Sequence, residues 1–336
     1  MTDNWRLFKG GDAEPHEVTE WPAAPPWRTF GRAKDDDEQR KRVRHVIADE
    51  NRDTVNAALH LHRPLLVTGG PGTGKSTLAR AIADELMLDE VLHWPVNSRS
   101  TLTEGLYRYD AVGRLRDASL ARRDPDSDTP EPGIGDYLRL GPLGTALLPA
   151  AKPRVLLIDE LDKGDVDLPN DLLTVFEEGT YEIPELARLT EKWVDVRTAD
   201  SGTLGMEETE GTSRSDERVG KVAVENGRVT CQVFPVVVIT SNGERDFPPA
   251  FLRRCVRLEL RQPDEEQLRK IVRMHLGDGV DDVARDLIAD FLERRESHSH
   301  DLATDQLLNA VHLRVSGVDF ESMRETVLRS LAESEV

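Results

Sequence analysis

A glycine-rich stretch in the first quarter of the chain has the residue types needed to hold phosphate groups. Glycines let successive backbone N–H groups turn inward around phosphate oxygens, a lysine neutralises the β and γ phosphates, and a hydroxyl can bind Mg²⁺. The stretch fits the pattern G-x-x-x-x-G-K-[ST], and its residues are Gly69, Gly70, Pro71, Gly72, Thr73, Gly74, Lys75 and Ser76, with Thr77 next. These residues predict a site for a nucleoside triphosphate, with Ser76 as a ligand of its Mg²⁺.

Both flanks of this stretch agree with a phosphate-binding loop. Residues 64–68 are a short, mainly apolar run that predicts a strand, and residues 76–86 have apolar side chains at helical spacing. A loop between a strand and a helix places the phosphates at the positive end of that helix. The alternative is a flexible turn that happens to contain a lysine, and correct flanks on both sides make it the weaker interpretation.

A second motif supplies two adjacent carboxylates. Residues 155–158 are apolar and predict a buried strand, which ends in Asp159 and Glu160. An acid at the carboxyl end of a central strand lies beside the phosphate loop in such sheets. We expect Asp159 to hold Mg²⁺ and Glu160 to polarise the attacking water, since one acid suffices for the metal. The alternative for Glu160 is a solvated residue at a strand end.

The two motifs together resemble the AAA+ superfamily, and two further stretches resemble its MoxR-like ATPases. They are L-R-L-G-P-L at 138–143 and D-L-P-N-D-L-L-T-V-F-E-E-G at 167–179. The resemblance covers about residues 40–330. It implies ATP and Mg²⁺ as cofactors, a homo-oligomeric, hexameric ring, and chaperone-like remodelling or activation of a partner protein. Relatives often act with a protein carrying a von Willebrand factor A domain, and some belong to bacterial conflict systems.

The resemblance also assigns residues further along the chain. Asn242 ends the predicted buried strand 236–242 and matches the sensor-1 position, although an asparagine there is also a common turn former. Arg253 and Arg254 match the segment that carries the arginine finger, which an adjacent subunit would supply; Arg253 is slightly favoured. The alternative is a pair of solvated surface arginines.

Three other positions bear on the resemblance. Many relatives have a sensor-2 arginine at the start of the third lid helix, and residues 302–308 contain none. Either another residue closes the lid on ATP, or this chain does without that contact. Asn97 is a candidate to restrain Glu160 until a partner binds. Tyr107 and Tyr109 could line a pore, but ordinary packing is the preferred interpretation of these tyrosines.

The predicted strands and helices indicate an α/β fold, and the resemblance implies a P-loop NTPase core of the AAA+ type with a parallel sheet sandwiched by helices, and a C-terminal helical lid. We expect an extended arm over 1–37, the nucleotide-binding domain over 38–262, and the lid over 263–336. Two segments, near 111–136 and 198–220, predict insertions, the second a mobile loop between hairpin strands. Four helices are expected in the lid.

Composition limits the function classes. Lys plus Arg total 44 and Asp plus Glu total 63, which gives a net charge of −19. This charge repels nucleic acid and anionic lipid, and it argues against the rival interpretation, a nucleic-acid-associated NTPase of a restriction-type system. Two cysteines, no apolar leader and no stretch of about 20 apolar residues predict a cytoplasmic protein without membrane contact. A nucleotide-dependent scaffold with little turnover is a further alternative.

Overall fold

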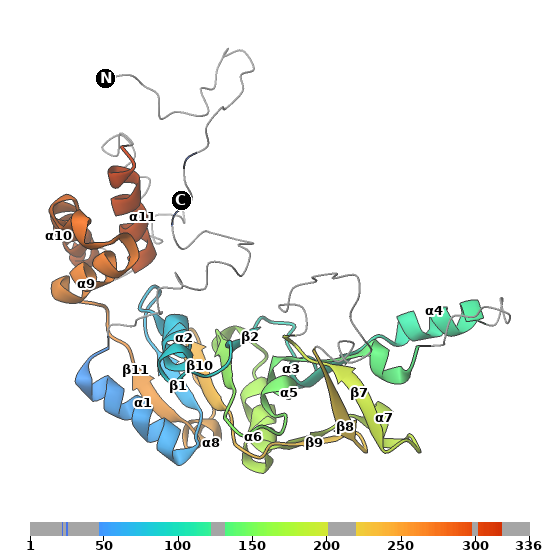
Figure 1. Cartoon of the computed structure of the whole chain (residues 1–336). Coiled ribbons are helices and arrows are strands. Elements are labelled where there is room, and N and C mark those ends of the chain that lie inside the picture. Colours follow the sequence, from blue (N-terminus) through green and yellow to red (C-terminus); the bar gives the residue numbers. More distant parts are fainter. Residues whose placement is uncertain are drawn as a thin grey trace, which may run out of the picture. The chain divides into compact units, whose positions relative to one another are not determined.

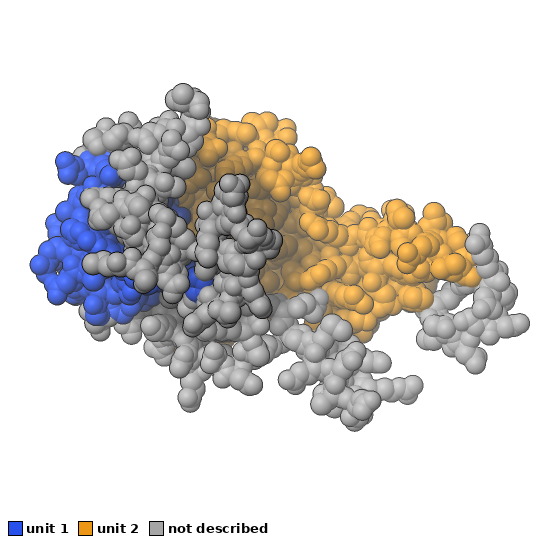
Figure 2. All heavy atoms as spheres, turned by 90° about the horizontal axis from the view of Figure 1, so that it is seen from above, with its two compact units in different colours: residues 1–47, 69–74, 260–336 blue, residues 48–68, 75–259 orange. Residues whose placement is uncertain are grey.

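The computed structural model describes residues 22, 25, 47–121, 132–200, 220–297 and 302–317. The chain divides into two compact units, which Figure 2 colours separately. The first comprises residues 1–47, 69–74 and 260–336, and the second comprises residues 48–68 and 75–259. The predicted arm over 1–37, apart from Pro22 and Pro25, lies outside the described residues.

A five-stranded parallel sheet forms the centre of the second unit. Its strand order is β11-β1-β10-β5-β2. The strands are β1 (Leu65–Thr68), β2 (Leu92–Pro95), β5 (Val155–Asp159), β10 (Val236–Ser241) and β11 (Val256–Glu259). In β1, β5 and β10 nearly every residue is buried, as expected for central strands of a sheet covered by helices.

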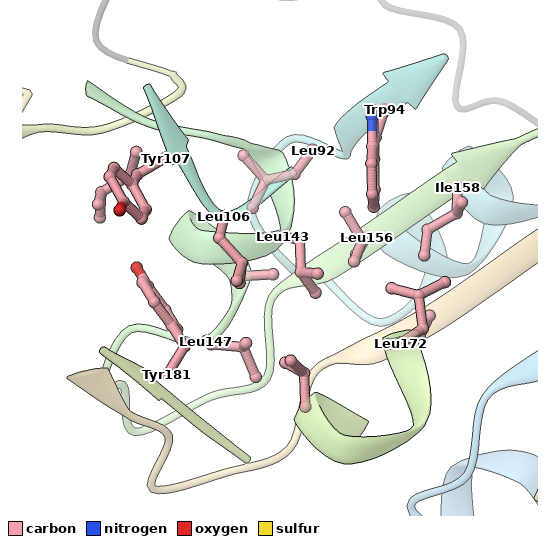
Figure 3. Packing of buried hydrophobic residues seen from close by; sticks show 14 of the residues in the cluster. Leu92, Trp94, Leu106, Tyr107, Leu143, Leu147, Leu156, Ile158, Leu172 and Tyr181 are labelled. Carbon is pink, nitrogen blue, oxygen red and sulfur yellow. The ribbon is translucent and has the colours of Figure 1, made fainter. Parts of the chain in front are cut away.

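Helices flank this sheet, so the predicted fold class is confirmed (Figure 1). Helix α1 (Asp49–Leu61) packs on β11, α2 (Lys75–Glu85) on β5 and β10, and α5 (Pro142–Ala146) on β2 and β5. The sequence predicts that the first helix begins near residue 40; it begins at Asp49, and residues 40–46 lie outside the described part. Figure 3 shows the side chains of Leu92, Trp94, Leu143, Leu156, Ile158 and Leu172 gathered in the core.

A second sheet of six short strands belongs to the same unit and was not predicted as such. Its order is β3-β4-β7-β8-β9-β6. The strands are β3 (Tyr107–Tyr109), β4 (Leu138–Leu140), β6 (Thr180–Glu182), β7 (Trp193–Arg197), β8 (Lys221–Glu225) and β9 (Arg228–Thr230). Strands β7 and β8 pair antiparallel, as a hairpin requires, and most of the predicted loop between them, residues 201–219, lies outside the described residues.

The remaining elements of the second unit are helices that connect these strands. The predicted insertion near 111–136 begins as helix α4 (Ala111–Ala121). Val112 and Leu115 of this helix are exposed, as expected for a surface insertion. Residues 122–131 are not described. The other helices are α3 (Leu102–Leu106), α6 (Leu168–Glu178), α7 (Pro184–Ala187) and α8 (Pro249–Leu252), with 3₁₀ turns at Ile134–Tyr137 and Leu161–Lys163.

The described C-terminal part of the first unit is helical. It contains α9 (Glu265–Leu276), the 3₁₀ turn Asp278–Val280, α10 (Asp281–Ser297) and α11 (Thr304–Val315), which we call the lid. A capping box begins α9: Asp264 Oδ1 accepts a hydrogen bond from Gln267 N–H, and Gln267 Oε1 accepts one from Asp264 N–H. Apolar side chains of the three helices form a separate core around Phe291. The predicted fourth helix, around residues 320–331, lies outside the described residues.

Candidate nucleotide site

The strand order brings the predicted polar residues of the second unit to one edge of the parallel sheet. Strand β10 lies between β1 and β5, so the carboxyl ends of these three strands are neighbours. Lys75 and Ser76 begin α2, which packs on β5 and β10. Asp159 ends β5, and Asn242 directly follows β10. The carboxyl edge of such a sheet is where ligands bind in open α/β folds.

Asp159 is held by three side chains. The Ser76 hydroxyl donates to Asp159 Oδ1 at 2.7 Å, and the Thr240 hydroxyl donates to the same oxygen at 2.6 Å. His93 Nε2 lies 3.2 Å from Asp159 Oδ2. Burial alone would raise the pKa of this carboxyl, but the hydrogen bonds from His93, Thr240 and Ser76 outweigh it and lower the pKa to about 2. Asp159 is therefore a carboxylate over the whole physiological range.

Glu160 is placed by different contacts. Its backbone N–H donates to Thr240 Oγ1 at 2.8 Å, and its carboxylate receives Lys163 Nζ at 2.9 Å and Asn242 Nδ2 at 3.4 Å. The Glu160 side chain is 42% exposed, whereas that of Asp159 is 20% exposed. Asp159 is thus enclosed by its partners, and Glu160 faces the solvent side of the edge.

Lys75 is buried beside these carboxylates. Desolvation lowers the pKa of its ammonium, while the charges of Asp162, Asp159 and Glu160 oppose that shift. Asp162 is itself buried, and its Oδ2 accepts the backbone N–H groups of Asn242 at 3.0 Å and Glu244 at 3.1 Å. The position of Asn242 is therefore fixed by Asp162.

Sequence reasoning missed four members of this cluster. His93, Thr240, Asp162 and Lys163 have no motif of their own; only the nearness of Asp162 and Lys163 to the acidic pair was a signal. Asn97 does not contact Glu160: its Oδ1 accepts Arg99 N–H at 2.9 Å, and Lys163 and Asn242 contact Glu160 instead. Asn97, Asp162 and Lys163 do line one cleft of ≈ 470 Å³.

The two candidate finger arginines differ in their surroundings. Arg254 forms an ion pair with Glu177 and donates from Nη1 to Ala250 O at 3.2 Å. Arg253 is exposed, and its guanidinium has no hydrogen bond or ion pair to any residue that the structure describes. Only the backbone of Arg253 is engaged among the described residues: its N–H donates to Pro249 O at 3.2 Å, and its carbonyl oxygen accepts Arg63 Nη1 at 3.4 Å.

The tyrosines of the proposed pore segment pack instead. Tyr107 is buried in the core shown in Figure 3, and its hydroxyl donates to Glu185 Oε2 at 2.9 Å. Burial first, and then Glu185, raise the pKa of Tyr107 to about 12. Tyr109 is half-buried, and its hydroxyl accepts a hydrogen bond from Arg114 at 3.0 Å. Packing was the preferred interpretation.

The loop residues 69–74 belong to the first unit, and their backbone explains the glycines. Gly72 has φ 70° and Gly74 has φ 86°, in the left-handed region where a side chain is strained. The Thr73 hydroxyl donates to Gly70 O at 2.9 Å and closes the turn. Pro71 is exposed to solvent in this turn.

The oxygens of Ser76 and Asp159 fit Mg²⁺. Mg²⁺ takes oxygen ligands and usually binds one or two carboxylates while keeping several waters. Ser76 Oγ and Asp159 Oδ1 lie 2.7 Å apart and can both face one ion. No group of three or more His, Cys, Asp or Glu side chains suited to a metal occurs in the described part of the chain.

Comparison with known proteins identifies the family. Residues 64–255, more than half of the chain, match the AAA domain (dynein-related subfamily). The chain belongs to this family. The match begins just before β1 of this AAA domain and ends at Cys255, so it includes both motifs, Asn242 and the two arginines.

Other comparisons are more distant. No curated protein matches this AAA protein in sequence. Two solved structures of NtrX from Brucella abortus, in complex with ATP and with ADP, are similar at 13% and 15% identity, with TM-scores of 0.42 and 0.41. Each match covers 84% of this chain but 56% and 55% of NtrX, so the chain spans about half the length of those proteins. None of the helices described is long and apolar enough to cross a bilayer.

Proposed function

We propose that this AAA protein hydrolyses ATP and uses the energy to remodel or activate a partner protein, as a MoxR-like member that works in a homo-oligomeric ring. The observation that carries the proposal is the difference in exposure and contacts between two adjacent carboxylates. Asp159 is enclosed and permanently charged, which suits a metal ligand. Glu160 is half-exposed and within reach of Asn242, which suits a base for water.

The residues of the chain have separate roles in this mechanism. Residues 69–74 cradle the phosphates with backbone N–H groups, and Lys75 neutralises them. Ser76 and Asp159 would hold Mg²⁺, which offsets the charge of the phosphates when bound. Glu160 accepts the proton of the attacking water, and Asn242 Nδ2, 3.4 Å from Glu160 Oε1, orients the same water. Thr240 fixes both acids, because it bonds Asp159 Oδ1 and Glu160 N–H.

The exposure of Arg253 supports a ring. A guanidinium that stabilises the transferring phosphoryl group increases turnover by about a thousandfold or more. Arg254 is engaged by Glu177, whereas the guanidinium of Arg253 is exposed and available to a neighbouring subunit. A protein partner, such as one with a von Willebrand factor A domain, fits the acidic net charge of −19 better than nucleic acid does.

The Glu160→Gln protein tests the proposal. We expect turnover to fall by about 100-fold or more, since a base is lost, with ATP binding retained. Size-exclusion chromatography of this variant should show a larger particle with ATP than without. Glu244→Gln, a change of an exposed carboxylate in the cleft lined by Asp162 and Lys163, is the matched control and should leave turnover unchanged.

Three results would contradict the proposal. Unchanged turnover in Glu160→Gln would favour the nucleotide-dependent scaffold. A monomer at all ATP concentrations would remove the role of Arg253 in a ring. Stimulation of the wild-type ATPase by DNA or RNA at physiological salt would favour the nucleic-acid-associated NTPase.

A further inference from the structure

The outer face of the second sheet carries positive side chains at one level of four neighbouring strands. Exposed residues alternate with more buried ones along β4 and β7, so the exposed ones share the face turned away from the core. The register pairs Arg108 with Arg139, and Arg139 with Arg197. Arg197 in turn pairs with Lys221. Since directly opposite residues point to the same face of a sheet, we call these four residues the cation row.

The cation row does not help the sheet to fold. Like charges directly opposite one another destabilise neighbouring strands, and every contact along the row is of this kind. The chain as a whole has the opposite charge, −19. A positive row that lowers stability on an otherwise acidic protein indicates an anionic ligand.

Most of the charge in the row is not neutralised by neighbours. Arg108 and Arg197 are exposed, and neither guanidinium has a hydrogen bond or ion pair with any residue that the structure describes. Arg139 Nη2 donates to a backbone carbonyl oxygen at 2.8 Å, which orients the side chain and leaves its charge. Lys221 is paired with Asp136 at 3.0 Å. The row therefore offers three guanidinium groups, whose planar geometry matches that of carboxylates.

The dimensions of the row favour a short acidic segment. Neighbouring strands lie about 4.8 Å apart, so the row is about 14 Å long. Alternate residues of an extended peptide are about 7 Å apart on one side, so acidic residues at i, i+2 and i+4 span the same length. A long polyanion would pass beyond the row and meet Asp136 and the exposed Asp195. The row also has no aromatic side chain on which a nucleic-acid base could stack.

We propose that the cation row binds an extended acidic segment of a partner protein, with carboxylates at alternate positions facing Arg108, Arg139 and Arg197. The site uses none of the residues assigned to ATP. It extends the proposed function, because it gives the chemistry by which a partner is recognised, and it can fail while the proposed hydrolysis of ATP stands.

Fluorescence anisotropy of a labelled peptide tests the inference on the full chain without nucleotide. The probe is an eight-residue peptide of alternating glutamate and serine, and the same peptide with glutamine in place of glutamate is its control. We expect saturable binding of the first peptide at low salt and none of the second. Added salt should weaken the binding, because the contacts are between exposed charges.

Variants of the chain locate the binding. Arg108→Gln combined with Arg197→Gln should weaken binding of the acidic peptide about tenfold or more, because two charge-assisted contacts are lost. Arg257→Gln combined with Arg285→Gln removes two exposed arginines of other elements and is the matched control. This control should bind the peptide like the wild type.

Thermal unfolding separates a binding role of the row from a structural one. The Arg108→Gln, Arg197→Gln protein should unfold at the temperature of the wild type or above it, because repulsion between opposite strands is relieved. A lower midpoint temperature would show that the row supports the fold, and it would overturn the inference.

Other results would also overturn it. One is the absence of saturable peptide binding, and another is unchanged affinity in the Arg108→Gln, Arg197→Gln protein. Tighter binding of a ten-residue oligothymidylate than of the peptide, lost in the same variant, would assign the row to nucleic acid. Peptide binding only after Glu207, Glu208 and Glu210 are changed to glutamine would show that acidic residues of this chain occupy the row. Because nucleotide is absent, none of these results bears on the proposed hydrolysis of ATP.

Discussion

The carboxylate edge of the parallel sheet and the lid side of the phosphate loop satisfy their buried polar groups differently. At the edge, Asp159 has three side-chain partners and the Thr240 hydroxyl has two, although Asp162 Oδ1 is buried without a partner in the described chain. At the lid, Thr304 and Gln262 have buried oxygens without partners among the described residues. The contacts of Asp159 and Thr240 fix these groups from within the protein. Catalytic groups need such an arrangement, because they must be in position before the reaction begins.

The two arginines extend this comparison, and they carry the largest expected effect. Arg253→Ala should lower ATP turnover by about a thousandfold, because the exposed guanidinium would act on the phosphate of a neighbouring subunit. Arg254→Ala should lower it much less, since Arg254 is paired with Glu177. Steady-state ATPase assays above the concentration at which the protein assembles measure both. Equal losses of ATP turnover in the two variants would show that the two arginines do not differ in their roles.

Lys75→Met tests whether the carboxylate edge of the parallel sheet holds the phosphates of ATP. It removes the cation that lies among Asp159, Glu160 and Asp162, so the phosphates of ATP would meet uncompensated carboxylates. We expect the Kd for ATP to rise about 100-fold or more, on the scale of two charge-assisted hydrogen bonds. Lys270→Met, on the exposed face of α9, is the control and should bind ATP normally. Comparable binding by the two variants would show that the edge does not hold phosphate.

The same change, threonine to valine, at the carboxylate edge and at the lid tests the comparison most directly. Thr240→Val should lower the free energy of unfolding by about 1–3 kcal/mol, because Glu160 N–H and Asp159 Oδ1 both lose a buried partner. Thr304→Val should lower it by nothing in the nucleotide-free protein. Urea unfolding of both variants without nucleotide measures the two changes in the free energy of unfolding. A larger loss in Thr304→Val than in Thr240→Val would reverse the assignment of the two regions.

Lowering the pH should reduce the stability that Asp159 gives to the carboxylate edge, over a defined pH range. Because the folded pKa of Asp159 is lowered to about 2, its ionised form stabilises the fold above its ordinary pKa of 3.8, and this contribution is lost as the pH falls from about 4 to about 2. The free energy of unfolding of the wild type should therefore decrease over this range by on the order of 2 kcal/mol more than that of Asp159→Asn. Parallel curves for the two proteins would show that the His93, Thr240 and Ser76 contacts are weak.

The sequence predicted the fold class and the lid helices because both depend on local periodicity. It also predicted the loop and the acidic pair, since each is a contiguous motif. It did not predict the Thr240 bridge or the His93 contact, because these depend on β10 lying between β1 and β5, an order set by packing over long separations. The catalytic roles of Glu160, Asn242 and the arginines stay predictions.

The second sheet escaped prediction for a related reason. Four of its six strands have three residues, too few for an alternating pattern to stand out from turns. Their partners are also distant, as Tyr107 pairs with Leu140 and Thr180 with Thr230. The apolar strands of the parallel sheet, by contrast, are continuous runs that can be recognised singly.

The backbone of Glu160 has a consequence for how this chain evolves. Its φ of 58° lies in the left-handed region, which costs a residue with a side chain about 1–2 kcal/mol relative to glycine. A Glu160→Gly protein would relax that strain and lose the carboxylate, so stability of the fold and the proposed role of Glu160 as a base make opposite demands at this position. Selection for thermal resistance alone would favour glycine here, whereas the proposed hydrolysis of ATP requires the carboxylate.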